Sequence, residues 1–375
     1  MTKCERVKLG AFYTPSLIVS KVLELVRDFR SKAVLLDPAC GYGAFIKQFT
    51  DWDYRIADID IQSVEYLKKC FNPDRVFLTD ALQNIDRSKY NISKNDFLVV
   101  IGNPPYNDWT SFYKKGQKGS FSIDKDVFDR DLGIAFLNAM NKLRADVICV
   151  LHPLSYLIKR ANFQRLNSFF TNYTLKRAFA FPSYLFKWTS CNLSFPIIIA
   201  LYIRDQKGFS WDDLLNFSFE FLDNTSTFTL SRIETIDGLV DKYPRREMSP
   251  IELYFITFRD INSILRNRDF VNKPSTYTIP ITWENFSLYA YLVAVKHYIL
   301  ENHPKRFWFY ANFSPLIDKK NFFVLQNAFI HYALVKSKAV AESIKEQAFK
   351  KFAWDESLEV VDNYFKNLFT LAYDN

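Results

Sequence analysis

The sequence predicts an α/β fold in which residues 1–205 form an open sheet with helices on both faces. A second, mixed or mainly helical domain is predicted for residues 206–375. In the first part, short apolar runs rich in β-branched residues alternate with segments of helical periodicity, as in βαβ units. A glycine-containing turn follows the first apolar run, where open α/β sheets bind ligands. Helical periodicity is strongest over residues 284–301 and from residue 327 onward.

The composition indicates a globular protein with a large core. Of the 375 residues, 49% are hydrophobic and 17% aromatic, which excludes intrinsic disorder. The first residues lead into no apolar segment, and the longest apolar run, residues 196–203, is too short to span a bilayer. The five cysteines lack paired spacing. We therefore expect a cytoplasmic protein with no secretory leader, membrane segment, disulfide framework or bound metal.

The net charge of +8 belongs to the first domain. Residues 1–205 contain 29 Lys and Arg against 20 Asp and Glu, and the excess is strongest over residues 107–187, with 13 against 6. A basic surface attracts polyanions such as nucleic acids. Ordinary solvated side chains on helices would explain the charge equally well, so this observation alone leaves both interpretations open.

The most specific stretch follows the apolar run 98–101, which predicts a buried strand. The tetrad Asn103-Pro104-Pro105-Tyr106 stands at its carboxyl end. Two consecutive prolines fix two φ angles and remove two backbone donors. The remaining polar groups are two acceptors, the side-chain oxygen of Asn103 and the carbonyl of Pro104, beside the Tyr106 ring. Such a rigid pair of acceptors suits a planar NH2 group.

A second motif follows the predicted strand 33–36. Residues 37–43 read Asp-Pro-Ala-Cys-Gly-Tyr-Gly, and we expect a helix from there to about Thr50. Gly41 and Gly43 allow the backbone to approach a ligand closely. The turn lacks the Lys-Ser/Thr of a P-loop and the third glycine of a dinucleotide fingerprint. The carboxylate of Asp37 at the strand end favours a cationic ligand instead.

Three further acidic or polar positions complete the predicted site. Asp58 ends another predicted strand about 20 residues after the glycine turn, where an acidic residue can bind ribose hydroxyls. Asp60 lies two residues further on and, instead of binding the ligand, could cap the helix predicted for residues 61–71. Thr14 precedes a helix opened by Pro15, so its hydroxyl and the free N–H groups of the first turn can hold a carboxylate.

Together these motifs resemble those of the N6-adenine-specific DNA methyltransferases, over about residues 10–205. Residues 37–46 are similar to the family's Asp-Pro-Ala-Cys-Gly-x-Gly-x-Phe-Leu, with Ile46 in place of leucine. Residues 10–15, Gly-Ala-Phe-Tyr-Thr-Pro, resemble its Gly-x-Phe-Tyr-Thr-Pro lead-in, with Ala11 where many members carry glutamine. The order of motifs matches the gamma arrangement, in which the cofactor motif precedes the tetrad and target recognition comes last.

The resemblance implies a Rossmann-like class I S-adenosylmethionine-dependent methyltransferase domain in residues 1–205 and a DNA target-recognition domain in residues 206–375. It implies S-adenosylmethionine as the cofactor, with Asp80 accepting from the amino group of its adenine. The implied cofactor-binding residues are Tyr13, Thr14, Asp37, Ala39, Gly41, Gly43, Asp58, Ile59, Asp80, Ala81 and Asn103. The implied catalytic residues are Asn103, Pro104, Pro105 and Tyr106.

The implied substrate is an adenine flipped out of double-stranded DNA, in a restriction–modification system with a separately encoded restriction endonuclease. Tyr106 and one aromatic ring of residues 182–188 would clamp the base. Phe186 is our choice, with Tyr184 and Trp188 left open. A polar loop, residues 107–129, carries basic residues among aromatic rings, as in strand-binding proteins, although a plain surface insertion explains it equally well. Its expected DNA-contacting residues are Lys114, Lys115 and Lys118.

Two other functions remain open at this point. A protein-glutamine or RNA-base amino-methyltransferase shares the tetrad, because its target is also a planar NH2 group. The chain could also be a modification subunit that needs a separate specificity subunit. His152, after the predicted strand 146–151, has no partner in the sequence pattern, so we interpret it as structural.

Overall fold

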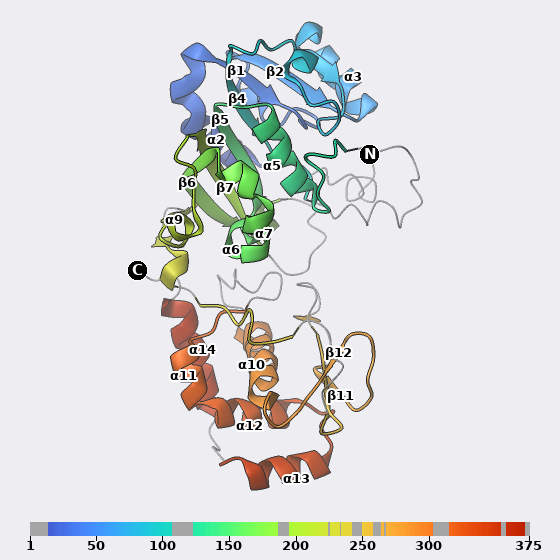
Figure 1. The fold of residues 1–375 in the computed structure, drawn as a ribbon, viewed down its shortest axis with the longest axis vertical. Helices are drawn as coiled ribbons and strands as arrows, with labels where there is room; N and C mark the ends of the chain where they lie inside the picture. Colours follow the sequence, from blue (N-terminus) through green and yellow to red (C-terminus); the bar gives the residue numbers. More distant parts are fainter. Residues whose placement is uncertain are drawn as a thin grey trace. The chain divides into compact units, whose positions relative to one another are not determined.

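The computed structural model divides the chain into two compact units (Figure 1). The first comprises residues 1–190 and 196–225, and the second comprises residues 191–195 and 226–375. The structure describes residues 14–106, 123–186, 195–223, 226–232, 234–241, 250–257, 264–265, 268–302, 315–353 and 358–371. No helix among these residues is both long and apolar enough to cross a membrane.

The first unit is built on one mixed sheet. Its strands are β1 (Ala33–Asp37), β2 (Asp53–Asp58), β3 (Val76–Leu78), β4 (Phe97–Gly102), β5 (Val147–Pro153), β6 (Tyr173–Pro182), β7 (Pro196–Arg204) and β8 (Phe219–Phe221). They lie in the order β3-β2-β1-β4-β5-β7-β6-β8. β1 to β5 pair in parallel, whereas β7 runs antiparallel to both β5 and β6. This confirms the predicted Rossmann-like sheet.

The unit boundary lies near residue 225 and not at the predicted 205. β8 pairs in parallel with β6, so the chain after Arg204 returns to the first unit and extends its sheet. Apolar periodicity did not reveal this, because β8 has only three residues.

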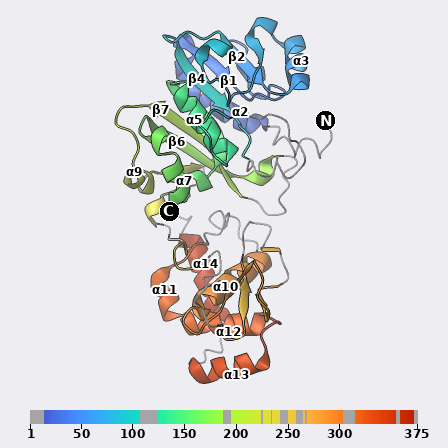
Figure 2. The same ribbon diagram turned by 45° about the vertical axis from the view of Figure 1, so that its right-hand side comes forward.

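Helices cover both faces of this sheet. They are α2 (Ser16–Val26), α3 (Ile61–Cys70), α5 (Leu132–Lys142), α6 (Ser155–Ile158), α7 (Arg160–Arg165), α8 (Asn167–Phe170) and α9 (Trp211–Leu215). α2 packs against β5 and β7, while α5 lies on the other face (Figures 1 and 2). All five residues of β1 are buried, and β4 and β5 are buried along nearly their whole length. Burial on both faces explains why these strands read as continuous apolar runs.

The helix expected after the glycine turn, up to Thr50, is absent. Residues 41–45 form turns, and only the short 3-10 helix η2 (Ile46–Gln48) follows. Phe45, Ile46 and Phe49 are all buried. Their three- and four-residue spacing resembles one face of a helix, but here a compact turn buries all three side chains.

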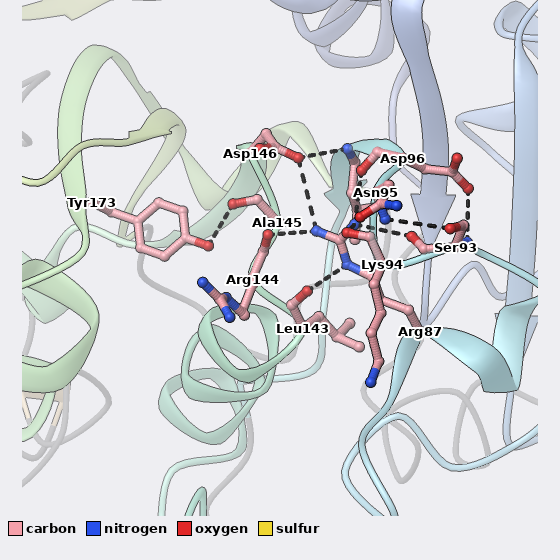
Figure 3. A network of polar contacts seen from close by, with 11 residues as sticks. Arg87, Ser93, Lys94, Asn95, Asp96, Leu143, Arg144, Ala145, Asp146 and Tyr173 are labelled. Atoms are coloured by element: carbon pink, nitrogen blue, oxygen red, sulfur yellow. Dashed lines mark hydrogen bonds and ion pairs between the residues drawn. The ribbon is translucent and has the colours of Figure 1, made fainter.

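Buried Arg87 joins two segments that lead into neighbouring strands (Figure 3). Its guanidinium donates to the carbonyl oxygens of Leu143 at 2.8 Å, Asp96 at 2.7 Å and Arg144 at 2.6 Å. It also lies 3.8 Å from the carboxylate of Asp146. These segments precede β4 and β5. Arg87 therefore fixes the amino-terminal edge of the sheet, opposite the edge where ligands bind in such folds.

The second unit is mixed and mainly helical, as expected. Its elements are β9 (Thr227–Phe228), β10 (Tyr254–Ile256), β11 (Phe270–Val271), β12 (Thr278–Pro280), α10 (Phe286–Asn302), α11 (Lys319–Val324), α12 (Gln326–Lys336), α13 (Glu342–Lys351) and α14 (Leu358–Leu371). A small antiparallel sheet has the order β11-β10-β12. α10 packs with α12 and α14 around Tyr291, whose ring lies 5.0 Å from Phe329 and 5.4 Å from Phe365. The helical pattern after residue 327 belongs to three helices, α12 to α14.

Candidate active site

A cavity of about 420 Å³ lies at the carboxyl ends of β1, β2 and β4. It brings together most of the site residues predicted from the sequence. Those that line it are Thr14, Asp37, Ala39, Gly41, Asp58, Ile59, Asp80, Ala81, Asn103 and Pro105. Lining residues that the sequence reasoning did not assign to the site are Ser16, Val19, Pro38, Cys40, Tyr42, Ala44, Phe45, Lys47, Gln48, Ser63, Thr79 and Phe136. Several of them stand inside the motif of residues 37–46, but Val19, Ser63 and Phe136 lie on helices without a local signal.

Asp58 ties the glycine turn to the end of β2. One of its carboxylate oxygens accepts from the backbone N–H of Gly41 at 2.7 Å, and the other accepts from that of Asp60 at 2.9 Å. Burial raises the pKa of Asp58 above its usual value. A carboxylate oxygen can accept more than one hydrogen bond, so Asp58 keeps acceptor capacity for ligand hydroxyls at the cavity.

Gly43 does not line the cavity, in contrast to the prediction. It adopts φ +74°, and a Cβ atom there would lie 2.8 Å from side-chain atoms of both Ile46 and Leu67. Gly41 also has a positive φ, +53°, with open space around its Cα. Gly41 therefore provides the close approach to a ligand, and Gly43 provides room for packing.

Asp37 is the most deeply buried acidic group of the cavity. One carboxylate oxygen accepts from the backbone N–H of Ala39 at 3.3 Å. A Cβ atom at Gly102 would lie 3.0 Å from that oxygen, so a glycine at the end of β4 leaves room for the carboxyl group. Burial raises the pKa of Asp37 to about 8. A bound ammonium would compensate this burial and favour the ionised form.

Asp60 and Asp80 hold the loops around the cavity. Asp60 caps α3 by accepting from the backbone N–H of Ser63 at 3.0 Å, which confirms the alternative role predicted for it. Asp80 accepts from the backbone N–H of Leu82 at 2.8 Å, and burial raises its pKa. Within the described part of the chain, no cluster of His, Cys, Asp and Glu is arranged to hold a metal ion.

The tetrad is joined to the segment that opens α2. The side-chain amide of Asn103 donates to the Thr14 hydroxyl at 3.3 Å, across 89 residues of sequence. The Asn103 oxygen accepts from the hydroxyl of half-buried Tyr106. Pro104 is buried beside them. Because an amide oxygen has two lone pairs, Asn103 can accept one more hydrogen bond. Enclosure of the Tyr106 hydroxyl raises its pKa well above the usual range, so it stays protonated.

His152 lies in the core of the sheet and outside the cavity lining, in line with a structural role. It is 1% exposed and stacks on Tyr156. Its Nδ1 lies 3.0 Å from the carbonyl oxygen of Pro153, and its Nε2 lies 2.7 Å from the Tyr202 hydroxyl. The neutral ring satisfies both contacts, with Nδ1–H donating and Nε2 accepting. Burial lowers its pKa to about 4.

The aromatic turn after β6 differs from our expectation. Phe186 is 3% exposed, and its ring packs 5.9 Å from that of Phe181, whereas Tyr184 is 67% exposed. Core packing occupies the Phe186 ring, so this geometry favours Tyr184 over the predicted Phe186 as the second ring against a base. Outside the described residues lie Tyr13, Trp188, Lys114, Lys115 and Lys118.

Residues 20–186 match the sequence model of the Eco57I restriction-modification methylase family. The match includes the glycine turn and the tetrad, hence most of the cavity. No curated protein sequence matches the chain.

Solved methyltransferase structures resemble the first part of the chain at low identity. A proposed class I S-adenosylmethionine-dependent methyltransferase from Listeria monocytogenes is 18% identical over 51% of this chain and 61% of its own, with a TM-score of 0.36. A proposed RNA methyltransferase from Pyrococcus horikoshii is 15% identical over 53% and 88%, with a TM-score of 0.34. A dimethyladenosine transferase from Plasmodium falciparum is 14% identical over 52% and 64%, also with a TM-score of 0.34.

Proposed function

We propose that the chain, whose residues 20–186 match the sequence model of the Eco57I restriction-modification methylase family, methylates N6 of adenine at specific sites in double-stranded DNA. One observation carries the proposal. The Asn103 side chain lines the cavity with a further lone pair on its oxygen, and its amide nitrogen is held by Thr14. This arrangement presents an acceptor for a planar NH2 group beside a cavity that suits a cationic cofactor.

The cofactor of this methylase domain is S-adenosylmethionine, which supplies an electrophilic methyl group when bound. The residues of the cavity fit it. The buried carboxyl of Asp37 matches its ammonium, and the oxygens of Asp58 match the ribose hydroxyls. Thr14 would bind the methionine end and Asp80 the adenine amino group, with Ile59 and Ala81 lining the cavity nearby.

Asn103 and Pro104 would activate the target amine by position. The exocyclic amine of adenine is a poor nucleophile, because its lone pair is delocalised into the ring. Hydrogen bonds from its two N–H groups to the Asn103 side-chain oxygen and the Pro104 carbonyl favour a pyramidal nitrogen, which directs the lone pair toward the methyl group. This is transition-state stabilisation by fixed dipoles together with orientation. The proton leaves to water after transfer.

Two aromatic rings would hold the flipped base. Tyr106 follows the acceptors directly, and Tyr184 is exposed on the turn after β6. Stacking on one ring stabilises a base by about 1–3 kcal/mol, which is comparable with the few kcal/mol that flipping costs. Tyr106 would contribute its aromatic ring and would not act as a general base, because its phenol stays protonated.

We assign DNA binding to the basic excess of residues 107–187 and target recognition to the second unit. The first supplies the electrostatic attraction expected for a polyanion. The second has its own core of helices and could present a distinct surface to DNA. A cytoplasmic location and a separately encoded restriction endonuclease complete the proposal.

The decisive experiment is expression of the chain alone in a host without adenine methylation, followed by sequencing of host DNA for N6-methyladenine. We expect one modified sequence motif. The Asn103→Ala variant should leave the DNA unmodified yet bind S-adenosylhomocysteine almost as well as the wild type, because it lacks only the acceptor for the amine.

Other outcomes distinguish the alternatives. Protein that binds the cofactor but labels RNA or a glutamine side chain, and no DNA, would refute the proposed substrate. Methylation that appears only with a second subunit would make the chain a modification subunit. Loss of cofactor binding in Asn103→Ala would assign that residue to the cofactor.

A further inference from the structure

The cavity lining is strongly unbalanced in charge. It contains four aspartates and one basic residue, Lys47. The aspartates suit the cationic parts of the cofactor, but its methionine end also carries a carboxylate, which they would repel. Lys47 makes no ion pair within the described part of the chain, and its side chain is exposed at the cavity. The one lining cation is therefore available to a ligand.

Lys47 stands on a segment held against the start of α2. It is the central residue of η2, and the next residue, Gln48, accepts from the Ser20 hydroxyl at 3.1 Å. One turn before Ser20, Ser16 lines the same cavity, as does Thr14. Lys47 thus shares its part of the lining with the hydroxyl groups of α2 and its lead-in, the part assigned above to the methionine end.

We propose that Lys47 binds the carboxylate of the methionine moiety, assisted by the Thr14 and Ser16 hydroxyls. The inference rests on the proposed function. An amino acid bound through its ammonium at Asp37 places its carboxylate close to a buried acid, so a nearby cation is needed to offset the repulsion. Lysine suits this task because its charge is compact and its stem flexible. Lys47 would thereby select ligands that carry the carboxylate.

The test is calorimetric binding of two ligands to the full chain: S-adenosylmethionine, and its decarboxylated analogue, which lacks only this group. In Lys47→Met we expect affinity for S-adenosylmethionine to fall about tenfold, while affinity for the decarboxylated analogue changes by less than about twofold. Lys47→Arg, which keeps the charge, should recover most of the loss. Lys68→Met serves as the matched control, because Lys68 is an exposed lysine on α3 outside the cavity lining.

Each other outcome is informative. An equal loss for both ligands in Lys47→Met would show a general effect on the cavity and overturn the assignment, as would unchanged binding of S-adenosylmethionine. A wild-type chain that binds neither ligand would refute the proposed cofactor itself. Unfolding curves of the ligand-free variants should coincide with that of the wild type, so that a loss of affinity is read as a loss of contact.

Discussion

Asp37 and His152 are both buried in the first unit, and burial moves their pKa values in opposite directions. Removal from water disfavours the charged form of either group. It therefore raises the pKa of the acid to about 8 and lowers that of the imidazole to about 4. Asp37 lines a cavity where a cation can enter. The His152 ring lies in the core, where it contacts Pro153, Tyr156 and Tyr202.

His152 predicts a defined acid sensitivity. The unfolded chain binds a proton on this residue below pH 6.5, whereas the native state binds it only below about 4. The contribution of His152 to stability is fully present above pH 6.5 and is lost as the pH falls from 6.5 to about 4. His152 alone lowers the free energy of unfolding by about 2 kcal/mol between pH 7 and pH 5. Asp37, with its pKa raised to about 8, acts in the opposite direction over this interval and is common to the wild type and the variant. In His152→Gln this part of the pH dependence should disappear from urea unfolding measured at both pH values.

Comparing the change of stability between the two pH values in the wild type and in His152→Gln separates this effect from any stability that the substitution itself removes. If His152→Gln loses as much stability as the wild type between pH 7 and pH 5, another group is responsible for the acid sensitivity.

At the scale of elements, β1, β4 and β5 could be predicted because each is buried on both faces and its apolar run is local in sequence. The cap of α3 by Asp60 is also a local feature, and the sequence therefore predicts it. The helix expected up to Thr50 does not form, because the same apolar spacing buries Phe45 and Phe49 in a compact turn. Likewise, the choice between Phe186 and Tyr184 depends on packing against Phe181, which no local pattern reveals.

The cavity could be predicted only in part for the same reason. Residues in the motifs are found by their order in the chain, but Phe136 enters the lining because α5 lies over the sheet. Lys47 directly follows a recognised motif, and only the cavity shows that it shares a lining with Thr14 and Ser16.

The edge of the sheet opposite the cavity yields a prediction about stability. Arg87→Met would leave the carbonyl groups of Leu143, Arg144 and Asp96 without their donor (Figure 3). The contact to Leu143 is buried and the other two are partly buried. Because an unsatisfied buried acceptor costs about 1–3 kcal/mol, the free energy of unfolding should fall by about 2–3 kcal/mol in urea denaturation.

Arg30→Met is the control, because Arg30 forms an exposed ion pair with Asp51 at 2.8 Å. Such pairs contribute about 0–1 kcal/mol. A loss in Arg87→Met no larger than in this control would contradict the role assigned to Arg87.

At the scale of the whole molecule, the charge is divided unevenly. Residues 1–205 carry the positive excess, and residues 206–375 are nearly neutral, with 20 Lys and Arg against 21 Asp and Glu. The second unit has its own aromatic core around Tyr291. Under the proposed function, we therefore assign attraction to DNA to residues 1–205 and discrimination between sequences to the second unit.

The polar loop predicted from the sequence for residues 107–129 gives the prediction at this scale. Replacing Lys114, Lys115 and Lys118 with Gln should weaken DNA binding and flatten its salt dependence. If all three contact phosphates, the slope of log affinity against log salt should fall by up to about 3. Fluorescence anisotropy over a series of salt concentrations measures it.

A matched set of exposed lysines, Lys68, Lys69 and Lys94, provides the same change in net charge elsewhere. An equal decrease of slope in both sets would indicate a general charge effect, and an unchanged slope in the first set would make the loop a plain insertion.

The hydrogen bond from Asn103 to Thr14 links the two ligands that the proposed function requires. The Thr14 hydroxyl accepts from the Asn103 amide and can still donate its own hydrogen to the carboxylate of an incoming methyl donor. A seated donor would therefore hold Thr14, and through it Asn103, in the orientation that receives the target amine.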